Sequence, residues 1–340
     1  MKTINETILF SKYKSSYSAA FGDLVVHISC LSSAFYLLWY YRNSWLAVLT
    51  IPLLAFMNDR NFIVFHDCGH NTYSPNKMLN YILGNLFGIF VFTPMCWNWH
   101  HGNHHLTSSN TTNKLNHKYN ETVYHSLYQY KQFSGFTQTL YKISRHPIVF
   151  FTLLPILYFV IKQRTDVLRY KLNKKRPYTQ SVIQILFETL FSNIGIAIFV
   201  YYLCVYEIIQ QYCVVLFISS LLLTFTFHNQ HTFNPSYVVN NEKWTQRNSG
   251  LVGSSLILYP NLFKYFSMGI EYHHIHHMNA KIPGYNLQAY HEEVISKSNI
   301  FDNVVKLTMT DCYNNLWLVL YDEENKKYIT FMEADYEITN

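Results

Sequence analysis

The sequence predicts an all-α integral membrane protein with two transmembrane helical hairpins, hence four spans, plus interfacial helices and a cytosolic helical cap that carries histidine-rich motifs. The first reason is composition: 49% of the residues are hydrophobic and only 14% are charged, whereas soluble globular domains average about 25% charged residues. The second is a set of apolar runs that approach the roughly 20 residues a helix needs to cross a bilayer. The third is that the histidine-rich motifs lie beside these runs and not within them.

The first hairpin is predicted at residues 24–41 and 45–65, with a hydrophilic break at residues 42–44 between its spans. The second of these spans contains Asp59 followed by Arg60. Ionisable groups at membrane depth are costly and usually face the protein interior. Asp59 is therefore either part of a patch with Arg60 near the headgroups or a partner of a metal-binding histidine, and the sequence leaves both open.

Two other apolar segments are predicted to be interfacial or re-entrant. Residues 79–95 lie between two histidine motifs, and a metal site must draw its ligands from one side of the membrane, so a single crossing there is excluded. Residues 148–161 contain Pro155 and are shorter than a span requires.

The second hairpin is predicted at residues 183–205 and 208–227. The basic run at residues 162–176 precedes it, and by the positive-inside rule this run is cytosolic. Each hairpin then starts and ends in the cytosol, which agrees with the requirement that all histidine motifs share one side.

The whole chain, residues 1–340, is accordingly expected to form one multi-pass membrane domain with residues 66–182 and 228–340 mainly cytosolic. Both termini lie on the cytosolic side in this topology. The membrane would be that of the endoplasmic reticulum in a eukaryote or the inner membrane in a bacterium. The net charge of +6 is modest and favours loops that face an anionic leaflet over a nucleic-acid partner.

Three motifs concentrate histidines at metal-ligand spacing. Residues i, i+3 and i+4 share one face of a helix, and neutral imidazole is a ligand of transition metals. Eight of the 17 histidines have this spacing within the three motifs: His66 and His70; His101, His104 and His105; His273, His276 and His277. A single such cluster is compatible with a zinc site or a polar surface, whereas three clusters indicate a shared site.

Eight or more imidazoles exceed what one metal binds, since zinc typically takes four ligands and keeps an open position when catalytic. They suit two metals with open positions, and an all-nitrogen site at a membrane surface favours redox chemistry with iron. Histidine ligands usually need a partner on the second ring nitrogen, commonly a carboxylate. The candidates by nearness in sequence are Asp59, Asp67, Glu271 and Glu292.

The other histidines are expected to have no ligand role. His100 and His274 lie inside the motifs but off the ligand spacing, and we interpret them as neighbours of the ligands. A structural or surface role is expected for His27, His117, His125, His146, His228 and His291.

The three motifs, with their flanks at residues 60–70, 97–105 and 271–287, resemble those of the membrane fatty acid desaturases, in particular the acyl-lipid Δ12-type branch. The resemblance implies an O2-dependent enzyme that introduces a cis double bond into the acyl chain of a membrane lipid. It implies that the eight histidines are the catalytic di-iron ligands and that His231, which matches a further family histidine, is a ninth iron ligand. It also implies two electrons from an external carrier, cytochrome b5 or ferredoxin.

Two alternatives remain at this point. A related di-iron lipid or carotenoid hydroxylase or ketolase would keep the metal centre and change the product. A metal-binding membrane transporter would instead bury ionisable ligands within its spans.

Overall fold

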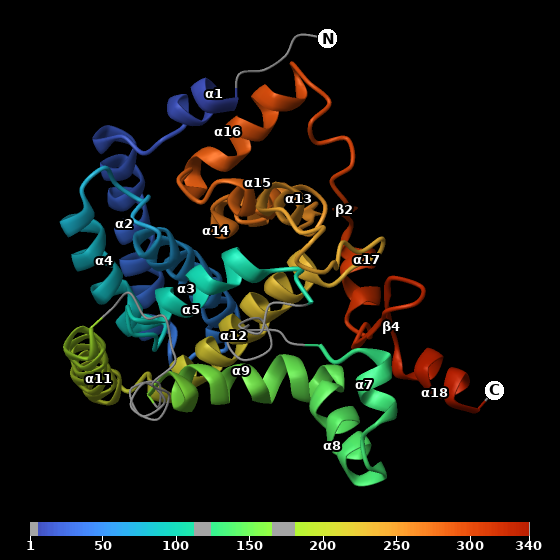
Figure 1. Ribbon diagram of the computed structural model, residues 1–340. Helices are drawn as coiled ribbons and strands as arrows, with labels where there is room; N and C mark the ends of the chain where they lie inside the picture. Colours follow the sequence, from blue (N-terminus) through green and yellow to red (C-terminus); the bar gives the residue numbers. More distant parts are fainter. Residues whose placement is uncertain (1–5, 112–123, 165–180, 340) are drawn as a thin grey trace.

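The computed structural model describes residues 6–111, 124–164 and 181–339 (Figure 1). The described part of the chain is mostly helical, which confirms the predicted fold class. Within the described residues, four helices are long and apolar enough to cross a membrane, and they overlap the four predicted spans: α2 (Tyr17–Tyr41), α3 (Ala47–Gly69), α11 (Val182–Val205) and α12 (Ile209–His231).

The main boundary differences lie at the start of α2 and at the ends of α3 and α12. Helix α2 begins at Tyr17 and not at residue 24, because the Ser16 side chain caps the helix by accepting a hydrogen bond from the backbone N–H of Ala19. Helices α3 and α12 continue past their apolar runs and carry His66 and His231 in their last turns.

Helix α3 is the centre of the bundle. It packs against α2, α12 and α4 (Lys77–Phe90). Its most apolar stretch is 56% buried, against 22% for each of the other three spanning candidates. Leu38 of α2, Leu54 of α3 and Tyr212 of α12 meet in one of the buried clusters. The other three helices therefore present most of their apolar surface outward, as lipid contact requires.

The two shorter apolar segments take different forms. Residues 79–95 contribute most of α4, which packs between α3 and α11. Residues 148–161 form a continuous but irregular helix: the π-helical turns η1 (Val149–Leu153) and η2 (Tyr158–Lys162) flank α9 (Leu154–Leu157). Pro155 has no N–H to donate, which accounts for irregular turns at this point. Helix α8 (Gly135–Arg145) precedes this segment at a bend of 64°. Whether these segments are interfacial stays a prediction, and most of the basic run at residues 162–176 lies outside the described residues.

The remaining elements form the cap, in which α13 to α16 gather at one end of the molecule (Figure 1). Its helices are α1 (Glu6–Lys12), α5 (Trp97–Thr107), α7 (Leu127–Lys131), α13 (Gln246–Leu251), α14 (Asn261–Ser267), α15 (His273–Met278), α16 (Gly284–Ile295), α17 (Met309–Asn315) and α18 (Phe331–Thr339). Helix α1 is tied to α16, because Phe10 stacks on Tyr290 with ring centroids 5.3 Å apart.

The cap also contains two small sheets that the sequence did not predict. Strand β1 (Leu256–Ile257) pairs in parallel with β2 (Lys306–Leu307), so that Leu256 lies opposite Lys306. Strand β3 (Leu320–Asp322) pairs antiparallel with β4 (Lys327–Ile329), with Leu320 opposite Ile329. Beside β1, the Ser255 N–H donates to the Gln230 carbonyl of α12 at 3.1 Å, and Asn234, which follows α12, donates to the Tyr328 carbonyl of β4 at 2.8 Å.

Candidate metal centre

Four helix segments bring the predicted ligands together. His66 lies in the last turn of α3 and His70 directly follows that helix. The second motif forms α5 and the third forms α15, while His231 is the last residue of α12. Because the four segments meet in the cap, all nine histidines fall into two groups of converging side chains.

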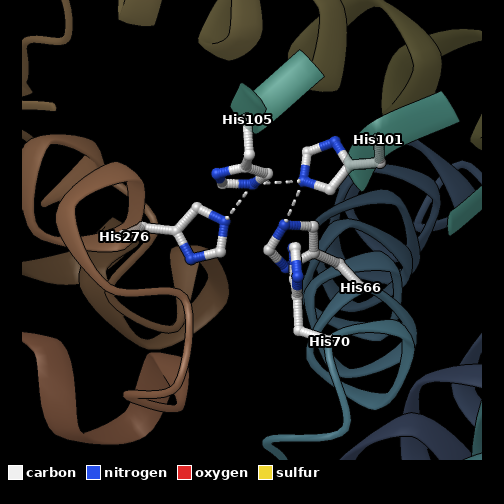
Figure 2. A group of neighbouring side chains, drawn as sticks. All are labelled: His66, His70, His101, His105 and His276. Atoms are coloured by element: carbon white, nitrogen blue, oxygen red, sulfur yellow. Dashed lines mark hydrogen bonds between the residues drawn. The ribbon is translucent and has the colours of Figure 1, made fainter. Parts of the chain in front are cut away.

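The first group consists of His66, His70, His101, His105 and His276, whose candidate ligand nitrogens all lie within 4.8 Å of one another. Figure 2 shows their rings turned toward a common centre. The Nε2 atoms of His66 and His101 are 2.8 Å apart. Those of His101 and His105, and those of His105 and His276, are 3.0 Å apart.

The second group consists of His104, His231, His273 and His277, again with candidate nitrogens within 4.8 Å of one another. The Nε2 atom of His231 is 2.9 Å from that of His104 and 2.9 Å from that of His273. Helix α5 therefore supplies His101 and His105 to one group and His104 to the other.

The nitrogen spacing fits metal binding. Two nitrogen ligands about 2.1 Å from a metal and at right angles to each other are separated by about 3.0 Å, which matches the distances in both groups. Moreover, the Nε2 atoms of His70 and His277 are buried and have no hydrogen-bond partner among the described residues. A buried polar atom without a partner is costly, and a cation bound in each group would satisfy the unpaired nitrogen of that group.

Burial also puts these imidazoles in the state that binds metals. Removal from water lowers the pKa of His70 to about 3, and neighbouring imidazoles contribute to the shift. For the same reasons, five other histidines of the two groups have pKa values well below the ordinary value of 6.5. They are His101, His105, His273, His276 and His277. A neutral ring offers a lone pair, whereas a protonated ring does not.

Of the four carboxylates predicted as partners, Asp67 contacts a candidate ligand. Its Oδ1 is 3.1 Å from Nδ1 of His66, and its Oδ2 accepts a hydrogen bond of 2.6 Å from the backbone N–H of Gly284. The other three accept hydrogen bonds from other side chains: Asp59 from Ser219, Glu271 from Ser267 and Glu292 from Gln288.

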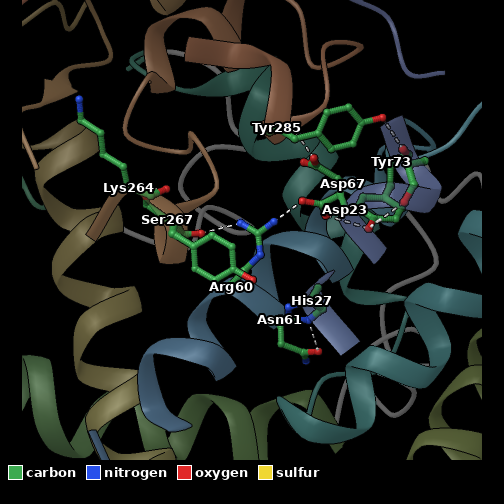
Figure 3. A network of polar contacts seen from close by, with 12 residues as sticks. Asp23, His27, Arg60, Asn61, Asp67, Tyr73, Lys264, Ser267 and Tyr285 are labelled. Carbon is green, nitrogen blue, oxygen red and sulfur yellow. Dashed lines mark hydrogen bonds and ion pairs between the residues drawn. The ribbon is translucent and has the colours of Figure 1, made fainter. Parts of the chain in front are cut away.

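A network of polar contacts lies beside the first group (Figure 3). Arg60 donates to Asp23, which also accepts a hydrogen bond of 2.9 Å from the Tyr73 hydroxyl. The Tyr285 hydroxyl donates to the backbone carbonyl of Tyr73 at 2.8 Å.

Neither interpretation of Asp59 was correct, because Arg60 pairs with Asp23 of α2 and Asp59 bonds to Ser219 of α12.

Tight packing fixes α3 against α5. A Cβ atom on Gly69 would lie 1.6 Å from Oδ1 of Asn98, so any larger residue at this position would displace the Asn98 side chain. The indole of Trp97 stacks on the imidazole of His101 with centroids 4.6 Å apart, and its Nε1 donates to the Tyr158 hydroxyl at 3.1 Å.

The remaining described histidines lie outside both groups, as expected. His100 packs on Trp99, and His274 packs on Phe301 and His291. The other contacts are those of His27 with Asn61, His228 with Tyr124 and Asn315, and His146 with Trp317. His117 lies outside the described residues.

A cavity of about 720 Å³ reaches both histidine groups. His66 and His101 of the first group and His273 of the second line it, and most of the remaining wall is aromatic or aliphatic. Its wall also includes His125 and Arg145, which the sequence did not identify as functional because neither belongs to a repeated motif. The arrangement brings a long apolar ligand to two candidate metal positions.

Comparison with known proteins agrees with this arrangement. The family model described as "Fatty acid desaturase" matches residues 43–299. A fatty acid desaturase of Bacillus subtilis is 31% identical over 288 residues, which cover 83% of this chain and 76% of the relative. An sn-1 oleoyl-lipid 12-desaturase of Picosynechococcus is 22% identical over 350 residues, covering 98% and 93% of the two chains. A chloroplastic omega-6 fatty acid desaturase of Brassica napus is 25% identical over 286 residues, covering 79% of this chain and 58% of the relative.

Proposed function

Because the chain belongs to the fatty acid desaturase family, we propose that it introduces a cis double bond into the acyl chain of a membrane lipid at a Δ12/ω6-like position, with O2 as oxidant. The omega-6 and 12-desaturase names of two relatives support this position. The observation that carries the proposal is the apolar cavity that reaches His66, His101 and His273.

The proposed metal ligands are the nine histidines of the two groups, which would hold two iron ions. Bound there, the irons would supply an O2-dependent oxidation in which two adjacent methylene groups each lose one hydrogen atom. These two hydrogen atoms, together with two further electrons and two protons, would convert O2 into two waters. Cytochrome b5 or ferredoxin is the proposed external electron carrier. Histidine is a suitable ligand for iron, and the absence of cysteine from both groups argues against a structural zinc site.

The chain's own contribution is to position the substrate. Aromatic and aliphatic walls favour a methylene chain over water. His66, His101 and His273 lie in the same wall, so a chain that fills the cavity contacts the candidate metal-binding side chains directly. Positioning of this kind is the protein's share of catalysis when a cofactor performs the oxidation.

We further propose the topology expected from the sequence, with one membrane domain, four spans, and both termini and all the histidine groups on the cytosolic side. The gathering of the ligand-bearing ends of α3 and α12 with α5 and α15 supports a one-sided centre. It also argues against a transporter, which would place its ligands along a path through the bilayer.

The proposal predicts the fatty-acid profile of a host that lacks polyunsaturated lipids and supplies an electron carrier. Expression of the intact chain should yield a new diunsaturated acyl chain, and His104→Ala should yield none, because His104 belongs to the second histidine group. His100→Ala is the matched control, since His100 lies in the same helix but packs on Trp99. A hydroxylated or keto lipid in place of the diene would reject desaturation and retain the metal centre.

A further inference from the structure

The cavity that reaches the histidine groups has several polar residues in its wall, and one set of them includes a cationic side chain. This set consists of His125, Tyr141, Ser144 and Arg145, and all come from the segment around α7 and α8. The histidine groups face the cavity from α3, α5 and α15 instead. A guanidinium group does not bind an aliphatic chain but does bind an anion, so Arg145 in the cavity wall indicates a substrate with a negatively charged group.

Aromatic rings hold Arg145 in place. Its guanidinium carbon lies 4.7 Å from the ring centroid of Tyr124, 5.4 Å from that of Tyr141 and 4.9 Å from that of Phe150. Two of these rings are themselves fixed, because the Tyr124 hydroxyl is 2.6 Å from Nδ1 of His228 and the Tyr141 hydroxyl donates to the backbone carbonyl of Val319 at 2.9 Å. Cation–π contact uses the face of a guanidinium, whereas its in-plane N–H groups recognise phosphate or carboxylate.

The outer surface of the same segment suits a lipid. Phe136, Leu140 and Ile143 recur on one face of α8 and are 74%, 50% and 54% exposed. Ile148, at the start of the following apolar segment, is 69% exposed. An amphipathic helix of this kind lies in the membrane interface with its apolar face among acyl chains. Tyr141 and Arg145 of the same helix line the cavity, so α8 has one exposed apolar side and another side that contributes to the cavity wall.

We propose that Arg145 binds the phosphate of a phosphoglyceride whose acyl chain extends to the histidine groups. The substrate class is then a phospholipid and not a neutral glycolipid. This inference rests on the proposed function, because it assumes that the cavity receives the acyl chain. Phosphate could also come from an acyl thioester on coenzyme A, but the exposed apolar face of α8 favours the lipid.

Binding tests the inference without any metal in the protein. Purified chain in detergent is titrated with phosphatidylglycerol or diglucosyldiacylglycerol carrying the same dibrominated acyl chains, and quenching of Trp97 is followed, since Trp97 lines the cavity. The Trp97→Phe variant reports the fluorescence change of the other tryptophans, which is subtracted from that of the wild type. We expect phosphatidylglycerol to bind about tenfold more tightly, as a charge-assisted bidentate contact implies. Arg145→Gln should reduce this preference to near one, and Arg145→Lys, which keeps the charge and loses the planar fork, should retain part of it.

Each contrary outcome has a distinct meaning. Equal binding of the two lipids by the wild type, or an unchanged preference in Arg145→Gln, overturns the inference. Tighter binding of acyl-coenzyme A than of phosphatidylglycerol, lost in Arg145→Gln, overturns the choice of a lipid. Thermal unfolding of both Arg145 variants near the wild-type temperature excludes a folding defect. Failure of the proposed function itself is separate: the iron-loaded wild type would then form no double bond in any of these acyl donors.

Discussion

At the scale of single residues, Asp67 links the metal centre to the rest of the fold. Its two carboxylate oxygens contact Nδ1 of His66 and the backbone N–H of Gly284, at the start of α16. A carboxylate on the second nitrogen of a ligand histidine fixes the ring's orientation and strengthens its lone pair. Asp67 is thus a positioning residue that acts through His66.

We predict that Asp67→Asn lowers metal affinity about 10- to 100-fold, the usual cost of losing such a partner. An asparagine side chain is uncharged and has a single acceptor oxygen, so it cannot accept hydrogen bonds from both His66 and Gly284 as the two carboxylate oxygens of Asp67 do. Competition with a chelator measures the affinity. Glu292→Gln is the control, because Glu292 was an equal candidate by sequence but bonds to Gln288. Equal affinities for the two variants would remove Asp67 from this role.

Residue spacing was enough to predict eight of the nine histidines that converge, because i, i+3 and i+4 spacing is a local property of a helix, whereas His231 was expected only from the family resemblance. Partners across the fold could not be predicted in the same way. Asp59 bonds to Ser219 and Arg60 to Asp23, and both pairings depend on how the helices pack. The contact of Arg145 with the cavity was not predicted, because it depends on how α8 packs against the rest of the molecule.

At the scale of elements, the contact between α3 and α5 sets the relative position of the first two histidine motifs. Gly69, at the end of α3, leaves no room for a Cβ atom beside Asn98. Overpacking of this kind typically costs about 1–3 kcal/mol. Displacement of α3 from α5 would also separate His66 from His101, whose nitrogens are now 2.8 Å apart.

Gly69→Ala should therefore lower both the unfolding temperature and the metal content. Gly102→Ala, in the middle of α5, is the matched control, since a Cβ atom there meets nothing within 4 Å and alanine favours a helix more than glycine does. Thermal unfolding and metal analysis of the two variants provide the comparison. An unperturbed Gly69→Ala variant would mean that the two helices do not meet as described.

The elements that the sequence predicted well were the long ones. Spans α2, α3, α11 and α12 have apolar runs that need no tertiary information. The π-helical turns on either side of α9 and the two-residue strands β1 and β2 are too short to leave a periodic pattern. Strand β1 pairs Leu256 with Lys306, and such distant pairing is determined by the packed cap.

At the scale of the whole molecule, folding buries many neutral imidazoles, so stability should depend on pH. His291 is 6% exposed, and burial lowers its pKa to about 4 from the ordinary 6.5. Between these values the unfolded chain binds a proton that the folded chain does not, so the unfolded state gains stability as pH falls. Above pH 6.5 neither state is protonated at this residue and the effect vanishes.

The unfolding temperature of the metal-free protein should thus fall as pH is lowered from 7.5 to about 5. His291→Phe should show a smaller fall, because it removes one proton-binding site and keeps a ring stacked on Phe301, now parallel to His291 within 3°. Calorimetry in detergent at several pH values measures both. A fall of equal size in the two proteins would show that His291 is not buried as a neutral group.

We propose that each of the two histidine groups holds one iron, and the metal content of the purified protein decides whether this is so. The wild type should contain about two irons per chain, whereas His70→Ala and His277→Ala should each contain about one, because these residues belong to different groups. His100→Ala should retain two. Zinc in place of iron would contradict this proposal. Loss of one metal from all three variants, His100→Ala included, would also contradict it.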